Sequence, residues 1–161
     1  MKNYPGISIL KKRYDFKSDS KTISGENPNF FKLMKKHSNN KFKILDLGCG
    51  SGELTIKLSP YFAEIIGIDG YKPYIKTALK DKKRKNIQNV QFIVADARKL
   101  PFSKETFDII YSSRGPLSAG KEFIKESLRV LKKKGLLIEE TIGENDLIKL
   151  KEVFGRIKER V

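Results

Sequence analysis

Apolar residues along the chain follow two alternating patterns from residue 42 onward. Short runs rich in Ile, Val and Phe predict buried strands over 42–47, 63–69, 90–95, 107–112 and 136–141. Apolar side chains three or four positions apart predict helices between them, over 52–59, 72–84 and 119–132, and a last one over 146–159. Strands that are apolar throughout and alternate with helices are typical of a parallel sheet covered on both faces. The pattern therefore predicts an α/β, doubly wound fold.

The first 26 residues show neither pattern. They are polar and basic, with several turn-forming residues, and we expect them to form an arm. Asn27 followed by Pro28 is typical of a helix start. We therefore expect a basic arm over 1–26 and a single domain over 27–161, which is long enough for one core.

The most specific motif lies where the first predicted strand meets the first helix after it, at Asp46-Leu-Gly-Cys-Gly-Ser-Gly52. Glycines in a strand–turn–helix junction let a nucleotide-sized ligand approach the backbone closely. The spacing is not the dinucleotide fingerprint, because the third glycine of that pattern would fall on Glu53. Asp46 would repel a pyrophosphate, so it suits a ligand that carries positive charge.

The second predicted strand ends at Asp69, 19 residues after Gly50. A carboxylate at this position can accept hydrogen bonds from both ribose hydroxyls. Dehydrogenases that bind dinucleotides share this arrangement, so Asp69 alone indicates only an adenosine-containing ligand.

Further motifs follow in order: Asp96-Ala-Arg-Lys-Leu-Pro-Phe102, then Phe107-Asp108, then Arg129-Val-Leu-Lys-Lys-Lys-Gly135. Together with the glycine motif and Gly67-Ile-Asp69, this ordered set resembles the class I S-adenosylmethionine-dependent methyltransferases over about residues 42–141. The resemblance implies S-adenosylmethionine as the cofactor. It also implies that Asp96 meets the adenine amine, that the Ala97 N–H meets a ring nitrogen, and that the loop from Ser112 faces the methyl group. The implied cofactor-binding residues are Asp46, Gly48, Cys49, Gly50, Gly52, Asp69, Gly70, Asp96, Ala97 and Ser112.

The family sheet normally continues into a sixth and a seventh strand, for which the chain has no room after residue 159. We therefore expect a Rossmann-like sheet of five parallel strands in the order 3-2-1-4-5, with strand 136–141 at an open edge. Unpaired backbone groups along that edge favour cover by the arm, or pairing with a second copy or another partner. We also expect a shallow pocket and weak activity of the isolated chain.

Composition narrows the class of protein. The chain has one Cys and one His, so we expect neither an internal disulfide nor a Cys/His metal site. It lacks an apolar run of membrane-spanning length and a signal peptide, so we expect a cytoplasmic protein. The net charge of +15 fits either solvated lysine-rich surfaces or a nucleic-acid partner.

The favoured function is methyl transfer to a small molecule, because the motif at 96–102 is most familiar from that branch of the family. An RNA methyltransferase stays open, although the Asn-Pro-Pro-Tyr signature of nucleic-acid amino methylation is absent. A cofactor-binding domain that needs a partner for activity stays open as well. Arg114 could bind an anionic substrate through its fork of donors, or be a surface residue. No residue stands out as a catalytic base.

Overall fold

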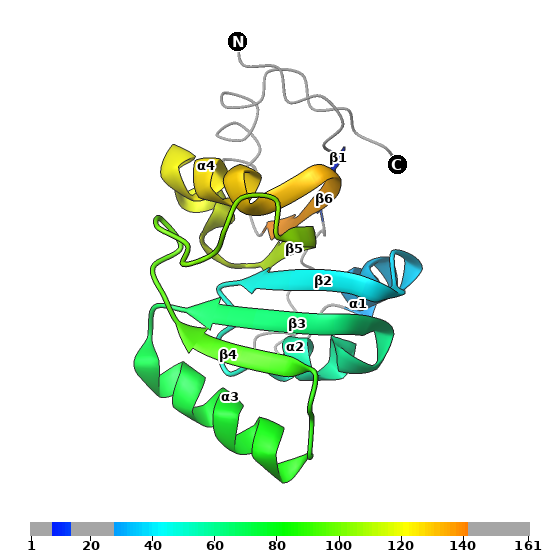
Figure 1. The fold of residues 1–161 in the computed structure, drawn as a ribbon, viewed down its shortest axis with the longest axis vertical. Coiled ribbons are helices and arrows are strands. Elements are labelled where there is room, and N and C mark those ends of the chain that lie inside the picture. The colour runs from blue at the N-terminus through cyan, green and yellow to red at the C-terminus, as the bar shows by residue number, and fades with distance from the viewer. Residues whose placement is uncertain (1–7, 14–27, 142–161) are drawn as a thin grey trace.

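The computed structural model describes residues 8–13 and 28–141, which form one sheet flanked by helices (Figure 1). The strands are β1 (Ser8–Arg13), β2 (Asn39–Leu47), β3 (Phe62–Asp69), β4 (Val90–Val94), β5 (Phe107–Ser113) and β6 (Leu131–Thr141). The helices are α1 (Pro28–Lys36), α2 (Glu53–Leu58), α3 (Lys72–Arg84) and α4 (Lys121–Val130), with short 3-10 turns at Ser59–Tyr61 and Pro116–Ala119. Every strand pair is parallel, and the order is β1-β6-β5-β2-β3-β4.

The fold class and the order of the five expected strands are confirmed, since β4-β3-β2-β5-β6 is the order 3-2-1-4-5. The four helices expected within the described residues are also present. The helix expected over 146–159 lies outside the described residues.

The strand count and the open edge were wrong. β1, from the segment expected to be an arm, pairs in parallel with β6, with Ile9 opposite Leu137 and Leu10 opposite Ile138. β1 thereby pairs with the backbone groups of β6 that would otherwise be unpaired. Cover of this edge by the arm was one of the alternatives that the sequence suggested. The sheet therefore has six described strands, and the edge next to β6 is not available to a partner.

β6 also begins earlier than expected, at Leu131 rather than at residue 136. Phe107 pairs with Leu131 and Ile109 pairs with Leu136, so β6 carries extra residues between these two points. The backbone turns through Lys134, which has a φ of 64°, and Gly135 follows. The lysines at 132–134 thus lie in an irregular strand entrance and not at a helix end. Lys132 forms a 2.9 Å ion pair with Asp108 there.

Alternate residues of the central strands fill two cores, one on each face of the sheet. On β2, Leu45 and Leu47 pack on the face that α4 covers, whereas Ile44 packs on the face that α1, α2 and α3 cover. Both faces are apolar because both are buried, as the continuous apolar runs indicated. Among the described helices, none combines the length and the apolar composition that crossing a bilayer requires.

Candidate functional site

The glycine motif forms the turn from β2 into α2, and all three glycines have positive φ, at 81°, 53° and 78°. A side chain on Gly48 would meet Pro116 at 2.6 Å, and one on Gly52 would meet the ring of Phe92 at 2.5 Å. A Cβ on Gly50 would meet no atom within 4 Å. Gly48 and Gly52 are therefore required by packing inside the protein, while Gly50 borders open space that a ligand can fill.

Asp46 lies beneath this turn and is only 3% exposed. Its Oδ2 accepts hydrogen bonds from Thr55 Oγ1 at 2.5 Å and from the Tyr111 hydroxyl at 2.6 Å. Burial raises the pKa of Asp46 from 3.8 to about 6, although the two hydrogen bonds act in the opposite direction. The charge of nearby Asp69 adds to the increase. A positive ligand group nearby would stabilise the ionised form of this carboxylate.

The carboxylate of Asp69, at the end of β3, connects the second strand end to the glycine turn. Its Oδ2 accepts a hydrogen bond from the Gly50 N–H at 3.0 Å, and its Oδ1 accepts one from the Tyr71 N–H at 2.8 Å. A carboxylate has about four acceptor positions. Two therefore remain for a ligand, which is the number that a pair of ribose hydroxyls needs.

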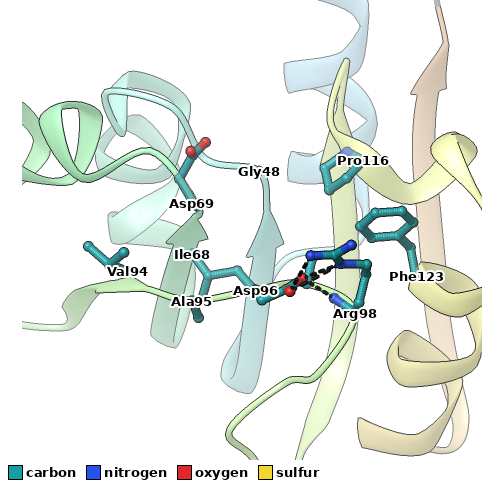
Figure 2. Close-up of a pocket in the computed structure, with 11 residues that line it drawn as sticks. Gly48, Ile68, Asp69, Val94, Ala95, Asp96, Arg98, Pro116 and Phe123 are labelled. Carbon is teal, nitrogen blue, oxygen red and sulfur yellow. Dashed lines mark hydrogen bonds and ion pairs between the residues drawn. The ribbon is translucent and has the colours of Figure 1, made fainter.

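A cleft of about 600 Å³ opens at the carboxyl ends of the central strands (Figure 2). Its lining residues are Gly48, Ile68, Asp69, Gly70, Val94, Ala95, Asp96, Ala97, Arg98, Pro116 and Phe123. Figure 2 shows Asp69 and Val94 on one side, Pro116 and Phe123 on the other, and Asp96 with Arg98 between them. This is the position at which open α/β sheets bind ligands, and the volume suits a nucleoside-sized molecule.

Asp96 does not present a free carboxylate to the cleft. Arg98 donates to it from Nε at 3.0 and 3.1 Å, from Nη2 at 2.8 Å and from its backbone N–H at 2.8 Å. These hydrogen bonds lower the pKa of Asp96. An adenine amine would have to share the Asp96 carboxylate with the Arg98 guanidinium or displace the guanidinium from it.

The loop after Asp96 is held in place from α4. Arg129 donates to the carbonyl oxygens of Phe102 and Leu100, at 2.8 and 2.9 Å. Glu126 accepts the Leu100 N–H at 2.8 Å and pairs with Arg129. Two of the sequence motifs therefore support each other in space, because the helix residues fix the path of the Asp96–Phe102 segment.

The ten expected site residues fall into two groups. Five line the cleft: Gly48, Asp69, Gly70, Asp96 and Ala97. The other five lie behind it or beside it: Asp46, Cys49, Gly50, Gly52 and Ser112. Ser112 is fully buried, and its hydroxyl has no hydrogen-bond partner among the described residues. Burial raises the pKa of the Cys49 thiol far above its usual range, so it stays protonated.

Sequence reasoning missed several residues of the site. Arg98 was not expected at Asp96, although a basic residue two positions after an acid in a loop is a signal that could have been read. Thr55 and Tyr111 were not expected to share Asp46, because 65 residues separate Tyr111 from it. Phe123 comes from α4, and nothing in the sequence indicated that it would reach the cleft.

Arg114 lies at the carboxyl end of β5 and is exposed. Its φ is 55°, and its backbone N–H donates to the Glu140 carbonyl at 3.1 Å. It does not line the cleft, but Pro116, two residues later, does.

Several known proteins with similar sequences are methyltransferases. An uncharacterised methyltransferase of Bacillus subtilis, YcgJ, is 33% identical over 66% of this chain and 44% of its own length. Malonyl-[acyl-carrier protein] O-methyltransferase of Bacillus anthracis is 35% identical over 76% of this chain and 45% of its own. Demethylmenaquinone methyltransferase of Lactobacillus johnsonii is 32% identical over 80% of this chain and 55% of its own length. The chain thus spans about half the length of the curated relatives that it matches.

The crystal structure of YcgJ superposes with a TM-score of 0.65 at 31% identity, covering 70% of this chain and 50% of that one. The sequence profile of a family described as a methyltransferase domain matches residues 38–159, which is most of the chain. The glycine turn, the acidic strand ends and the position of the cleft agree with this match. The chain therefore belongs to the class I S-adenosylmethionine-dependent methyltransferases.

Proposed function

We propose that the cleft binds S-adenosylmethionine and that the chain transfers its methyl group to a small-molecule acceptor. The observation that carries the proposal is the carboxylate of Asp69, which is fixed by two backbone N–H groups and keeps two acceptor positions for a ribose. The open space beside Gly50 leaves room for the ligand, and the buried carboxylate of Asp46 favours a cationic group nearby. The residues present fit the cofactor that the family uses.

When bound, the cofactor supplies an activated methyl group on a sulfonium. The contribution of the protein is then to align the acceptor, which can supply several orders of magnitude in rate. Two ionisable groups beside the cleft, Tyr111 and Cys49, are not suited to take a proton from the acceptor. Tyr111 donates to Asp46 and its pKa is raised by burial, and the Cys49 thiol is also protonated. We therefore propose neither of these two groups as a catalytic base.

The acceptor class is proposed from two supports. The names of two relatives refer to malonyl-[acyl-carrier protein] and to demethylmenaquinone, which favours metabolite chemistry. Arg114 is an exposed cation two residues from the cleft wall, and it forms no ion pair with any described residue. An anionic group on the acceptor would suit it.

The test is a transfer assay with tritiated S-adenosylmethionine, the full chain and two pools of acceptors. One pool is a cell extract filtered to retain only small molecules, and the other is purified total RNA. Counts should enter the small-molecule pool, and Asp69→Ala should lower them strongly at limiting cofactor concentration. If the chain labels RNA alone, and Asp69→Ala lowers that labelling, RNA would replace this acceptor class.

A further inference from the structure

The connection from β4 to β5, residues 95–106, runs over the α4 face of the sheet without forming a helix. Near its start, Asp96, Ala97 and Arg98 line the cleft, and we call these three residues the loop wall. Outside helices and strands, backbone N–H and C=O groups have no regular partners, so other parts of the chain have to supply them. The groups that hold this connection therefore also hold the loop wall.

Two side chains of α4 supply these partners just after the loop wall. Arg129 donates to the carbonyl oxygens of Phe102 and Leu100, at 2.8 and 2.9 Å, and Glu126 accepts the Leu100 N–H at 2.8 Å. The two side chains also pair with each other, with Arg129 Nη2 2.8 Å from Glu126 Oε2. Neither side chain lines the cleft. They can therefore influence a ligand only through the backbone that they hold.

The same helix forms another part of the cleft, because Phe123 lines it from α4. Steps of three residues lead along the helix from Phe123 to Glu126 and on to Arg129. Residues three apart are neighbours on a helix surface. The pair formed by Glu126 and Arg129 thus connects the loop wall to the helix that carries Phe123.

We propose that Glu126 and Arg129 are positioning residues for the cofactor, which fix the loop wall relative to Phe123 without touching the ligand. This inference rests on the proposed function, because the ligand is the cofactor proposed above. Arg129 suits the task because a planar guanidinium can donate to two carbonyl oxygens and a carboxylate at once, whereas a Lys ammonium is a point charge. A wall that is free to shift would hold its ligand less well, since small displacements of binding groups are costly.

Loss of the Arg129 side chain should loosen the loop wall and leave the rest of the fold in place. The Arg129 carbonyl accepts the Glu105 N–H at 3.0 Å, and the Val130 carbonyl accepts the Thr106 N–H at 2.7 Å. These backbone hydrogen bonds do not need the side chain. The end of the connection next to β5 therefore stays attached to α4 when the side chain is removed.

The test is isothermal titration calorimetry of the full chain with S-adenosylhomocysteine. Arg129→Ala should weaken binding by about tenfold, because the loop wall is no longer fixed. Millimolar methylguanidinium should restore most of the affinity, since the Arg129 side chain is 39% exposed and the added cation can take its place. Methylammonium has the same charge but no planar fork of donors, and it should restore little.

Arg84→Ala is the matched control, because Arg84 also pairs with an acid three residues earlier on its helix, Asp81, at 3.2 Å. It should change the affinity by less than about twofold, as expected for an exposed ion pair away from the cleft. Glu126→Gln is a milder second variant, which keeps an oxygen for the Leu100 N–H and loses the charge that faces Arg129. It should weaken binding by about threefold.

Melting curves by circular dichroism check that each variant is folded at the temperature of the titration. Wild-type affinity in both Arg129→Ala and Glu126→Gln would overturn the positioning role and leave the proposed function intact. A loss of affinity that methylguanidinium does not restore would overturn the positioning role as well, because it indicates a general loss of structure. If the wild-type chain does not bind S-adenosylhomocysteine, the proposed function is overturned, and this inference with it.

Discussion

The Gly50 N–H donates to the Asp69 carboxylate at 3.0 Å, and this hydrogen bond joins the turn after β2 to the end of β3, 19 residues further along the chain. Asp69 therefore has two tasks. It fixes the glycine turn, and it keeps acceptor positions for a ligand. A substitution at Asp69 should affect both the order of the turn and the binding of the cofactor.

The first prediction concerns that carboxylate. Asp69→Ala should weaken binding of S-adenosylhomocysteine by about 1–3 kcal/mol, because charge-assisted hydrogen bonds are lost. Asp69→Asn should retain more of the affinity, since an amide oxygen can still accept from Gly50. Isothermal titration calorimetry measures both variants. Unchanged affinity in Asp69→Ala would show that the ligand does not use this carboxylate.

The second prediction separates two glycines of the turn. Gly50→Val should abolish cofactor binding, because its side chain would enter the open space next to the cleft. Gly52→Ala should instead lower the free energy of unfolding by roughly 2–4 kcal/mol, because its Cβ would meet Phe92 at 2.5 Å on a backbone with positive φ. Urea unfolding and calorimetry on both variants distinguish the effects. Full cofactor affinity in a folded Gly50→Val chain would contradict this assignment.

The third prediction concerns the pH dependence of stability. The folded chain holds a proton on Asp46 up to a pKa of about 6, above the ordinary value of 3.8. The stability linked to this proton is therefore fully present below pH 3.8 and is lost as the pH rises through about 6. The shift corresponds to roughly 3 kcal/mol.

Urea unfolding at several pH values measures this pH dependence of stability, with Asp46→Asn as the control whose residue 46 cannot titrate. Between pH 4 and pH 7.5 the wild-type chain should lose roughly 2–2.5 kcal/mol relative to Asp46→Asn. If the two stability curves run parallel over this range, Asp46 has no raised pKa.

The fourth prediction concerns Arg98, whose guanidinium takes most of the acceptor positions of Asp96. If an adenine amine needs these positions, then Arg98→Ala should tighten binding of S-adenosylhomocysteine, by about two- to fivefold as expected for an exposed ion pair. The gain should vanish with the S-inosyl analogue, which lacks the amine. Weaker binding by Arg98→Ala would show that Arg98 contacts the ligand itself.

Much of the fold could be predicted from the sequence because its strands are buried on both faces. The run Ile65-Ile-Gly-Ile-Asp69 is typical of a central strand, and the bounds of α3 match the periodic segment 72–84. β1 was missed because Ser8–Arg13 is short and half basic, so its local pattern is weak. Its pairing partner, β6, lies more than 120 residues later, and only the need to cover that edge favours the strand.

The parts of the candidate site that lie within one short segment were predicted, and the parts that depend on contacts between distant segments were missed. The glycine turn and Asp69 follow from short motifs whose geometry the backbone dictates. The pair formed by Tyr111 and Asp46 depends on β2 and β5 lying side by side, and Phe123 depends on how α4 packs. The contact between the Arg98 guanidinium and Asp96 depends on the side-chain rotamer of Arg98, which the pattern of residues does not predict.

The most direct test of the account is a calorimetric titration of the full chain with S-adenosylhomocysteine and, separately, with NAD. The geometry of the Asp69 carboxylate and the glycine turn predicts binding of S-adenosylhomocysteine with a Kd in the micromolar range, about −8 kcal/mol. It predicts no comparable heat with NAD, because Asp46 lies beneath the turn where a pyrophosphate would have to bind. Tight binding of NAD with no response to S-adenosylhomocysteine would contradict the central claim.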